Sequence, residues 1–182
     1  MDERVAAVVV AAGDGQRAGL AGNKVLALLA GRPLVTHAVD ALRAHPSVGE
    51  IVLVLRPEDR PLMPPLEVRV VDGGPTRGAS VLAGLEALAG RPDRVVLVHD
   101  GARPLARPED VERVLAALEG ADGAALAVRV EEALKRVGPD GLVETSPDRR
   151  DHWLARTPQA YRLDLLRRAL RANPASEDCA AA

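Results

Sequence analysis

The chain has 182 residues and a formal net charge of -2, and this length suits a single domain with one hydrophobic core. Apolar residues make up 47% of the sequence and charged residues 27%, the balance of a folded globular protein rather than of a disordered chain. The weak charge, and an aromatic content limited to Trp153 and Tyr161, argue against nucleic-acid binding, which needs basic surfaces and stacking side chains.

The single cysteine, Cys179, excludes an internal disulfide and a Cys-based zinc site, and it fits a reducing compartment. The N-terminus lacks the basic start of a signal peptide, and no apolar run approaches the ~20 residues of a membrane span. We therefore expect a cytoplasmic protein with no membrane partner.

Short apolar runs alternate with segments of helical periodicity along the chain, which predicts an α/β fold: a Rossmann-like, mostly parallel sheet flanked by helices. The expected strands are Val5–Ala11, Glu50–Leu55, Glu67–Val71, Arg94–His99 and Ala124–Val130. The expected helices are Leu34–Ala44, Ser80–Ala89, Pro108–Leu118 and Leu163–Ala172. The segment Glu131–Arg150 is charged and broken by glycine and proline, so we expect a hairpin arm projecting from a single domain over residues 1–182.

The first motif, AAGDGQRAGLAGNK, follows the first expected strand. Its glycines, among them Gly13 and Gly15, present N–H groups to phosphate oxygens, while Arg17 and Lys24 add positive charge. A dinucleotide fingerprint would need glycine at Ala18, and an ATPase P-loop would need Gly-Lys-Ser/Thr. A triphosphate cradle fits better; a glycine-rich turn with solvated charges is the plainer alternative.

The second motif, VVDGGPTRGASV, joins a strand end to a helix start. Gly74 permits close backbone approach to a ligand, and Ser80 offers a hydroxyl near the helix N-terminus. Ser80 acting only as a helix cap is the alternative.

The third motif, VLVHDGARPL, places Asp100 at the carboxyl end of a central strand, where ligands of parallel sheets sit. A carboxylate there can hold Mg²⁺ together with substrate phosphates, so Asp100 is the expected metal ligand. Arg103 braces the loop or a phosphate, unless it only forms a surface ion pair. A His99–Asp100 metal dyad lacks further ligands.

Together with DRRDHWLARTPQAY, these motifs resemble, in order and over almost the whole chain, the 2-C-methyl-D-erythritol 4-phosphate cytidylyltransferase family of isoprenoid biosynthesis. The resemblance implies a fold like that of nucleotide-diphospho-sugar transferases, CTP and a phosphorylated polyol as substrates, Mg²⁺ as cofactor, and a homodimer that exchanges arms. The implied roles are transition-state stabilisation by Arg17 and Lys24, nucleotide binding by Ala11, Ala12, Gly13, Gly15, Gly74 and Ser80, metal binding by Asp100, and acceptor binding by Arg103, Arg149 and Thr157.

The sequence departs from that family in three places. Asn23-Lys24-Val25 stands where the family usually has Pro-Lys-Gln, and Glu132-Ala133 stands in place of an Asp-Thr pair. The final ASEDCAAA resembles the beginning of a further strand and a Lys-x-Thr segment, so the chain is expected to end early relative to the family.

The expected reaction transfers CMP from CTP to 2-C-methyl-D-erythritol 4-phosphate, and a phosphate acceptor needs no general base. Two alternatives remain open. One is a nucleotidyltransferase for another sugar or alditol phosphate, such as ribitol 5-phosphate. The other is a non-catalytic nucleotide-binding homologue, which shares the fold without turnover.

Overall fold

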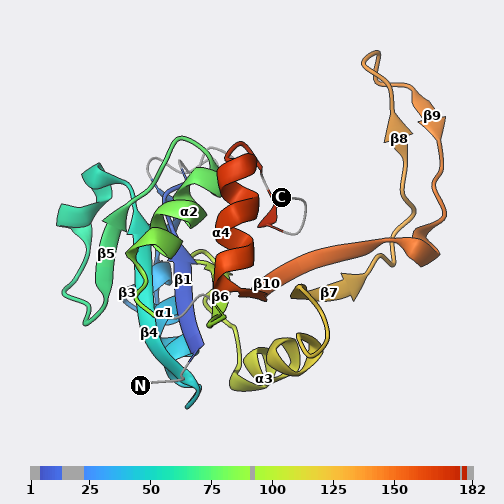
Figure 1. Ribbon diagram of the computed structural model, residues 1–182. Coiled ribbons are helices and arrows are strands. Elements are labelled where there is room, and N and C mark those ends of the chain that lie inside the picture. Colours follow the sequence, from blue (N-terminus) through green and yellow to red (C-terminus); the bar gives the residue numbers. More distant parts are fainter. Residues whose placement is uncertain (1–4, 14–22, 91–92, 177, 180–182) are drawn as a thin grey trace.

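A six-stranded sheet forms the centre of the protein, whose computed structural model (Figure 1) describes residues 5–13, 23–90, 93–176 and 178–179. In spatial order the strands run β5-β4-β1-β6-β10-β7. Their bounds are Arg69–Asp72 for β5, Val48–Leu55 for β4, Val5–Val10 for β1, Val95–Asp100 for β6, Trp153–Arg162 for β10 and Gly123–Arg129 for β7. The first four are parallel, and β10 is antiparallel to both of its neighbours.

Four helices cover the sheet on both faces (Figure 1). They are α1 (Leu34–Arg43), α2 (Arg77–Ala87), α3 (Pro108–Ala117) and α4 (Leu163–Ala172). On β1, Ala7 and Val9 pack into the core with α1 and α3, while Ala6 and Val8 pack into the core with α2 and α4. Because alternate residues of a strand point to opposite faces, this double coverage requires the nearly all-apolar strand that the sequence has.

Helix α4 follows its sequence pattern most closely. Leu163, Leu166 and Leu170 recur at three- and four-residue spacing and are all buried, which is the stripe of a helix with one apolar face. The expected bounds of this helix are confirmed residue for residue. Helix α2 instead begins three residues before the expected Ser80, because Thr76 accepts a hydrogen bond from the N–H of Ala79 at 3.0 Å and caps the helix there.

The sheet has one strand that the sequence reading did not predict. Strand β10 lies between β6 and β7, so the strand expected at 124–130 pairs with β10 rather than with the parallel core. The sequence WLARTPQAYR contains a proline and two arginines, which breaks the apolar alternation that marks a strand. The sheet is therefore mixed, and β6, whose end carries Asp100, is central as expected.

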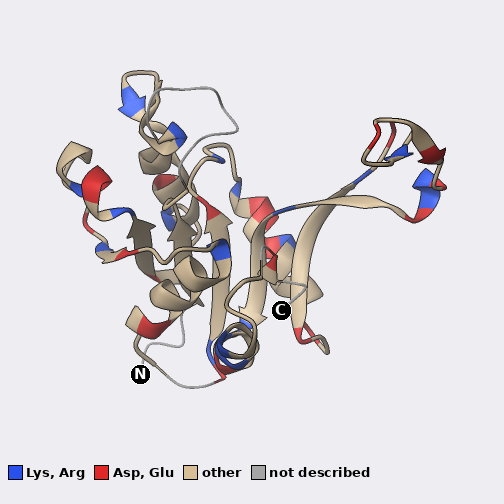
Figure 2. Ribbon diagram, turned by 90° about the horizontal axis from the view of Figure 1, so that it is seen from above, with Lys and Arg blue, Asp and Glu red and all other residues tan. Residues whose placement is uncertain are grey.

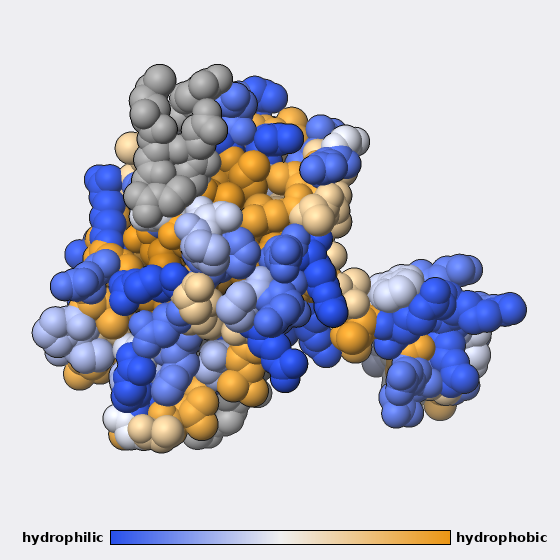
Figure 3. All heavy atoms as spheres, turned by 90° about the horizontal axis from the view of Figure 1, so that it is seen from below, coloured by the Kyte–Doolittle hydropathy of each residue, from blue (hydrophilic) through white to orange (hydrophobic). Residues whose placement is uncertain are grey.

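The arm expected at 131–150 is confirmed. It leaves the sheet between β7 and β10 and carries a small antiparallel hairpin of β8 (Arg136–Val137) and β9 (Val143–Thr145), followed by the short helix η4 (Arg149–Asp151). Acidic and basic residues lie along it (Figure 2), and its far end is mostly hydrophilic (Figure 3), with Val137, Leu142 and Val143 of the hairpin exposed. Such a surface gives the arm no core of its own to pack against.

The remaining elements are short and lie near the first motif and β4. They are η2 (Lys24–Leu26), η3 (Pro57–Leu62) and an antiparallel pair of β2 (Leu28–Leu29) with β3 (Arg32–Pro33). Among the described helices, none is both long and apolar enough to cross a bilayer.

Candidate active site

The three motifs meet at the carboxyl edge of the parallel strands. A Cβ atom added to Gly73 would lie 2.3 Å from the Cβ of Ala12, and one added to Gly101 would lie 2.9 Å from the Cβ of Ala11. Both approaches are too close for any residue with a side chain. The glycines of the second and third motifs therefore allow these loops to pack directly against the end of β1, beside Gly13, which is exposed and has open space around it.

Ser80 forms hydrogen bonds within the second motif instead of capping α2. Its buried hydroxyl accepts a hydrogen bond from the N–H of Gly74 at 3.1 Å and donates to the carbonyl of Thr76 at 2.9 Å. The capping alternative for Ser80 is wrong, since Thr76 caps the helix. Ser80 holds Gly74 in place, while a direct contact of either residue with the nucleotide stays a prediction.

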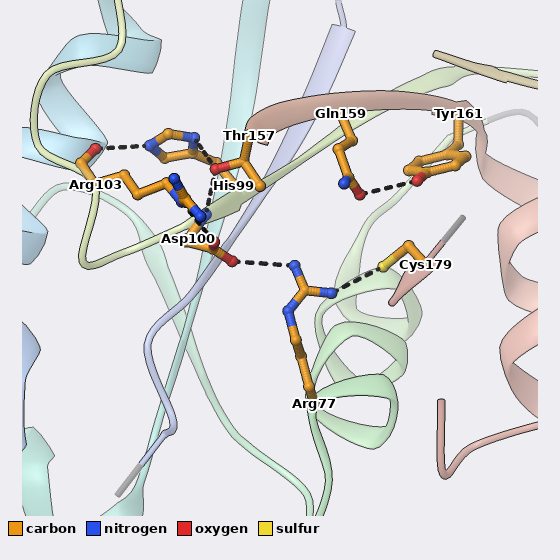
Figure 4. Close-up of polar contacts among 8 residues, drawn as sticks. All are labelled: Arg77, His99, Asp100, Arg103, Thr157, Gln159, Tyr161 and Cys179. Carbon is orange, nitrogen blue, oxygen red and sulfur yellow. Dashed lines mark hydrogen bonds and ion pairs between the residues drawn. The ribbon is translucent and has the colours of Figure 1, made fainter. Parts of the chain in front are cut away.

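Asp100 lies between two arginines (Figure 4). Arg77, the first residue of α2, donates from Nη2 to Oδ1 at 3.0 Å, and Arg103 donates from Nε to Oδ2 at 2.8 Å. Arg77 also reaches the Sγ atom of Cys179 at 3.4 Å. Arg77 is absent from the site residues predicted from sequence, although its position between Gly74 and Ser80, both assigned to the nucleotide, is a signal that points to it.

The arginines keep Asp100 ionised. Partial burial alone would raise the pKa of this carboxyl, but the hydrogen bond from Arg103 and the charge of Arg77 outweigh it, so the pKa lies below its ordinary value. Arg103 thus forms an ion pair with Asp100, and its contact with a phosphate or with the acceptor stays a prediction.

A cation site of protein groups alone is not present: the described residues contain no cluster of three or more His, Cys, Asp or Glu side chains that could hold a metal. Asp100 nevertheless fits the donor set expected for Mg²⁺ with a nucleotide. Its carboxylate has about four lone-pair positions, and each oxygen accepts one hydrogen bond from an arginine, so positions remain for a cation that draws its other ligands from phosphates and water.

His99 connects the predicted acceptor residues through a buried chain of hydrogen bonds (Figure 4). Its Nε2 lies 2.9 Å from the carbonyl of Arg103, which can only accept, so Nε2 carries the proton and Nδ1 accepts. The Thr157 hydroxyl, 3.0 Å away, therefore donates to Nδ1, and it accepts from the N–H of Asp100 at 3.2 Å. Both ends of the ring are used inside the protein, which leaves no nitrogen for the metal dyad considered above.

Burial keeps the His99 ring neutral. It lowers the pKa of His99 below the ordinary value, against a smaller opposing effect of the hydrogen bond to Arg103 and the charge of Asp100. The positioning role of His99 was missed because its partner Thr157 is distant in sequence, on the strand that was itself not predicted.

Of the two predicted cations of the first motif, only Lys24 lies among the described residues. Lys24 begins η2 with an exposed side chain, and Asn23 before it is buried and caps the helix. Arg17 and Gly15 lie outside the described residues. The structure thus brings Ala11, Ala12, Gly13, Gly74, Ser80, Asp100, Arg103 and Thr157 to one edge of the sheet.

Arg149 is the exception. It lies in η4 on the arm, is exposed, and donates to the carbonyl of Glu131 at 2.5 Å, a contact within the arm. The arm extends away from the sheet (Figure 1), so one chain does not bring Arg149 to Asp100.

Comparison with known proteins decides the family. The family pattern described as 2-C-methyl-D-erythritol 4-phosphate cytidylyltransferase matches residues 5–181. The chain belongs to this family. A cytidylyltransferase of the same description from Cereibacter sphaeroides is 47% identical over 175 residues, which cover 93% of this chain and 77% of that protein.

Solved structures agree in fold. The 2-C-methyl-D-erythritol 4-phosphate cytidylyltransferase of Thermus thermophilus is 31% identical, with a TM-score of 0.78 over 98% of this chain and 82% of that one. The 4-diphosphocytidyl-2C-methyl-D-erythritol synthase of Anaerococcus prevotii is 27% identical, with a TM-score of 0.79 over 98% of this chain and 80% of that one. The fold class and the family resemblance of the four motifs are therefore confirmed.

Proposed function

We propose that this chain transfers CMP from CTP to 2-C-methyl-D-erythritol 4-phosphate, giving 4-diphosphocytidyl-2-C-methyl-D-erythritol and pyrophosphate. The observation that carries the proposal is the meeting of three motifs of one cytidylyltransferase family at the carboxyl edge of the sheet, around Asp100. Ligands of open α/β sheets bind at this edge.

The reaction is an attack of a phosphate oxygen of the acceptor on the α-phosphorus of CTP. The new P–O bond forms as the bond to the β-phosphate oxygen breaks, and pyrophosphate leaves with that electron pair. Since the acceptor is already an anion, no general base is required. The protein must instead align two polyanions and stabilise the charge that grows on the non-bridging and leaving oxygens.

Each part of the site has a role in that task. Ala12 and Gly13, after β1, offer backbone N–H groups to the triphosphate, whereas the N–H of Ala11 is bonded to the carbonyl of Val54 at 2.8 Å. Lys24 and Arg17 stabilise the charge that develops during attack. The ion pairs of Asp100 fix Arg77 and Arg103 at the same edge, where their remaining N–H donors can bind phosphate. Thr157 and Arg103 hold the acceptor side.

Asp100 would hold Mg²⁺ there together with the nucleotide phosphates. When bound, the cation supplies charge neutralisation on the phosphate oxygens. The arginines around Asp100 are consistent with this role. They repel the charge of Mg²⁺ until the negative triphosphate is bound beside it, which couples cation binding to nucleotide binding.

The arm is proposed to complete the acceptor site of a second subunit in a homodimer. Arg149 is exposed, its hydrogen bond to Glu131 stays within the arm, and it would bind the acceptor phosphate of the neighbouring chain. The reaction is placed in the cytoplasm, which agrees with a single cysteine and no internal disulfide.

Pyrophosphate release tests the proposal directly. Purified protein with Mg²⁺ and CTP should release pyrophosphate only when 2-C-methyl-D-erythritol 4-phosphate is added, and ATP, GTP and UTP should support little turnover. Because Ala133 departs from the family near the arm, ribitol 5-phosphate belongs in the acceptor panel. Faster turnover with ribitol 5-phosphate would reassign the acceptor, and no turnover with any pair would favour a non-catalytic homologue.

A further inference from the structure

Asn23, the residue before Lys24, makes more contacts than a helix cap requires. Its Oδ1 accepts from the N–H of Val25 at 3.2 Å, which is the capping bond. Its Nδ2 donates to the carbonyl of Ala11 at 2.9 Å and to Oδ2 of Asp59 at 2.7 Å. The side chain is only 6% exposed. Both N–H donors of the amide and its oxygen are therefore used.

Asp59 gives this contact a fixed anchor. Its side chain, in η3, is buried and receives two hydrogen bonds from Arg56, Nε to Oδ2 at 2.7 Å and Nη2 to Oδ1 at 2.9 Å. Arg56 foremost, and Asn23 next after it among the bonding partners, lower the pKa of Asp59 against the opposing effect of burial. A charge-assisted, two-point contact of this kind holds the carboxylate in one geometry.

The location of these bonds matters more than their number. Ala11 comes directly after β1, and Asn23 directly before η2, so the two residues stand on either side of the glycines of the first motif in sequence. The Asn23 amide joins them directly and ties both to η3. The backbone that carries Lys24 is thereby fixed relative to the end of β1.

We infer that Asn23, anchored by Asp59 and Arg56, is a positioning residue for Lys24: its amide bonds the start of η2 to Ala11 at the end of β1 and so sets the backbone from which Lys24 reaches the triphosphate. The inference rests on the proposed function, since it acts through the catalytic role of Lys24. Preorganisation is the physical reason: a cation that must meet charge in the transition state loses its effect when its support moves by about 1 Å.

Asn23→Asp separates this role from plain capping. Aspartate caps helices as well as asparagine does, but it has no donor for Ala11 and it repels Asp59. We expect Asn23→Asp and Asn23→Ala to lower kcat at least about tenfold with the acceptor KM within about twofold. Asn173→Ala, the same change at the chain's other asparagine, which is exposed and directly follows α4, should leave both constants unchanged. Wild-type kcat in Asn23→Asp would overturn the inference. If that variant does not fold, Asn23→Ser keeps an oxygen that can cap the helix and removes both amide N–H donors, which bond Ala11 and Asp59.

A double-mutant cycle tests whether Asn23 acts through Lys24. In a Lys24→Ala background, Asn23→Ala should lower the residual kcat by less than about twofold, because the group that it positions is already gone. Equal losses in both backgrounds would show that Asn23 acts on the fold or on another group.

Amide hydrogen exchange tests the positioning without relying on turnover. In Asn23→Ala the Val25 N–H loses its side-chain acceptor, so we expect exchange across residues 24–27 to accelerate about tenfold or more, with the α4 amides unchanged. Unchanged exchange would overturn the inference even if the wild-type protein failed every turnover assay, and that failure would count against the proposed function alone.

Discussion

The carboxyl edge of the sheet and the arm are built in opposite ways. At the edge, contacts join residues that are far apart in sequence: Arg77 with Asp100, and the N–H of Asp100 with Thr157. On the arm, the hydrogen bonds of the described residues stay within the arm, such as those of Lys135 with Ser146 and of Arg150 with Asp148. The edge is therefore a product of the whole fold, whereas the arm holds only its own shape.

This difference separates the part of the proposed reaction that one chain can carry out from the part that is proposed to need a second chain. Stabilisation of a transition state requires charges that are already oriented before the reaction, and buried long-range contacts provide that orientation at the edge. The exposed side chains of the arm are oriented only locally. In the proposed function, Arg149 therefore binds a substrate only when the arm meets a second surface.

The largest effect is expected for Lys24→Ala. In the proposed mechanism, backbone N–H groups of the first motif hold the ground-state triphosphate, and Lys24 stabilises the charge that appears during attack. We expect kcat to fall about 10²-fold or more with a smaller change in CTP affinity. Steady-state kinetics and CTP titration measure the two quantities. An unchanged kcat would reduce the motif to a binding loop.

Asp100→Asn should have the next largest effect. The change keeps the shape and removes the formal charge that balances Arg77 and Arg103 and would hold Mg²⁺. We expect the Mg²⁺ concentration for half-maximal activity to rise about tenfold or more. Asp122→Asn, an exposed site before β7, is the matched control. An identical Mg²⁺ dependence in Asp100→Asn would remove this residue from the cation site.

Much of the edge could be predicted from sequence because local patterns encode it. Apolar runs place the parallel strands, glycines mark where loops must approach β1, and Asp100 follows a strand that is buried on both faces. The boundary of α2 was missed by three residues because Thr76 and Ser80 are both good caps, and only the folded geometry shows that Ser80 holds Gly74 instead.

The partners of these residues could not be predicted, because they depend on a strand whose sequence does not look like one. Strand β10 brings Thr157 beside His99, and its arginines and proline hide it from a periodicity reading. Asn23 likewise looks like a simple departure from a family pattern until Asp59 is seen next to it. Side chains that position others through space leave little trace in local sequence.

Arg149→Ala is expected to act across subunits. It should raise the acceptor KM about tenfold and leave the thermal midpoint nearly unchanged, because an exposed contact contributes little stability. Wild-type protein should be a dimer in light scattering, and a monomer at micromolar concentration would refute the arm exchange.

Mixing variants sharpens this test. Each of the Arg149→Ala and Lys24→Ala proteins should have reduced turnover alone. A heterodimer of the two combines an intact Lys24 in one subunit with an intact arm from the other. In a two-fold symmetric dimer, random reassortment should restore about a quarter of the sites. If mixing restored no activity, the arm would act on the site of its own chain, and the proposed exchange of arms between subunits would be wrong.

The smallest effect, and the one most specific to the edge, is a change in how stability depends on pH. Burial lowers the pKa of His99 below its ordinary value, with Asp100, Arg103 and Asp110 as the charged groups around the ring. Below pH ~6.5 the unfolded chain takes up a proton at His99 that the folded ring does not, so the free energy of unfolding should fall as pH decreases from about 7 toward 5.

The variant His99→Asn tests this pH dependence, because it keeps an acceptor near the Thr157 hydroxyl but cannot titrate. It should be less stable at pH 7 by about 1–3 kcal/mol, because the carbonyl of Arg103 loses its buried donor, and its stability should decline less steeply with acid, by up to about 1.4 kcal/mol per pH unit. Denaturant unfolding at several pH values measures both quantities. The other histidines are present in both proteins and cancel in the comparison, so identical slopes would mean that the ring of His99 takes up its proton as readily in the folded edge as in the unfolded chain.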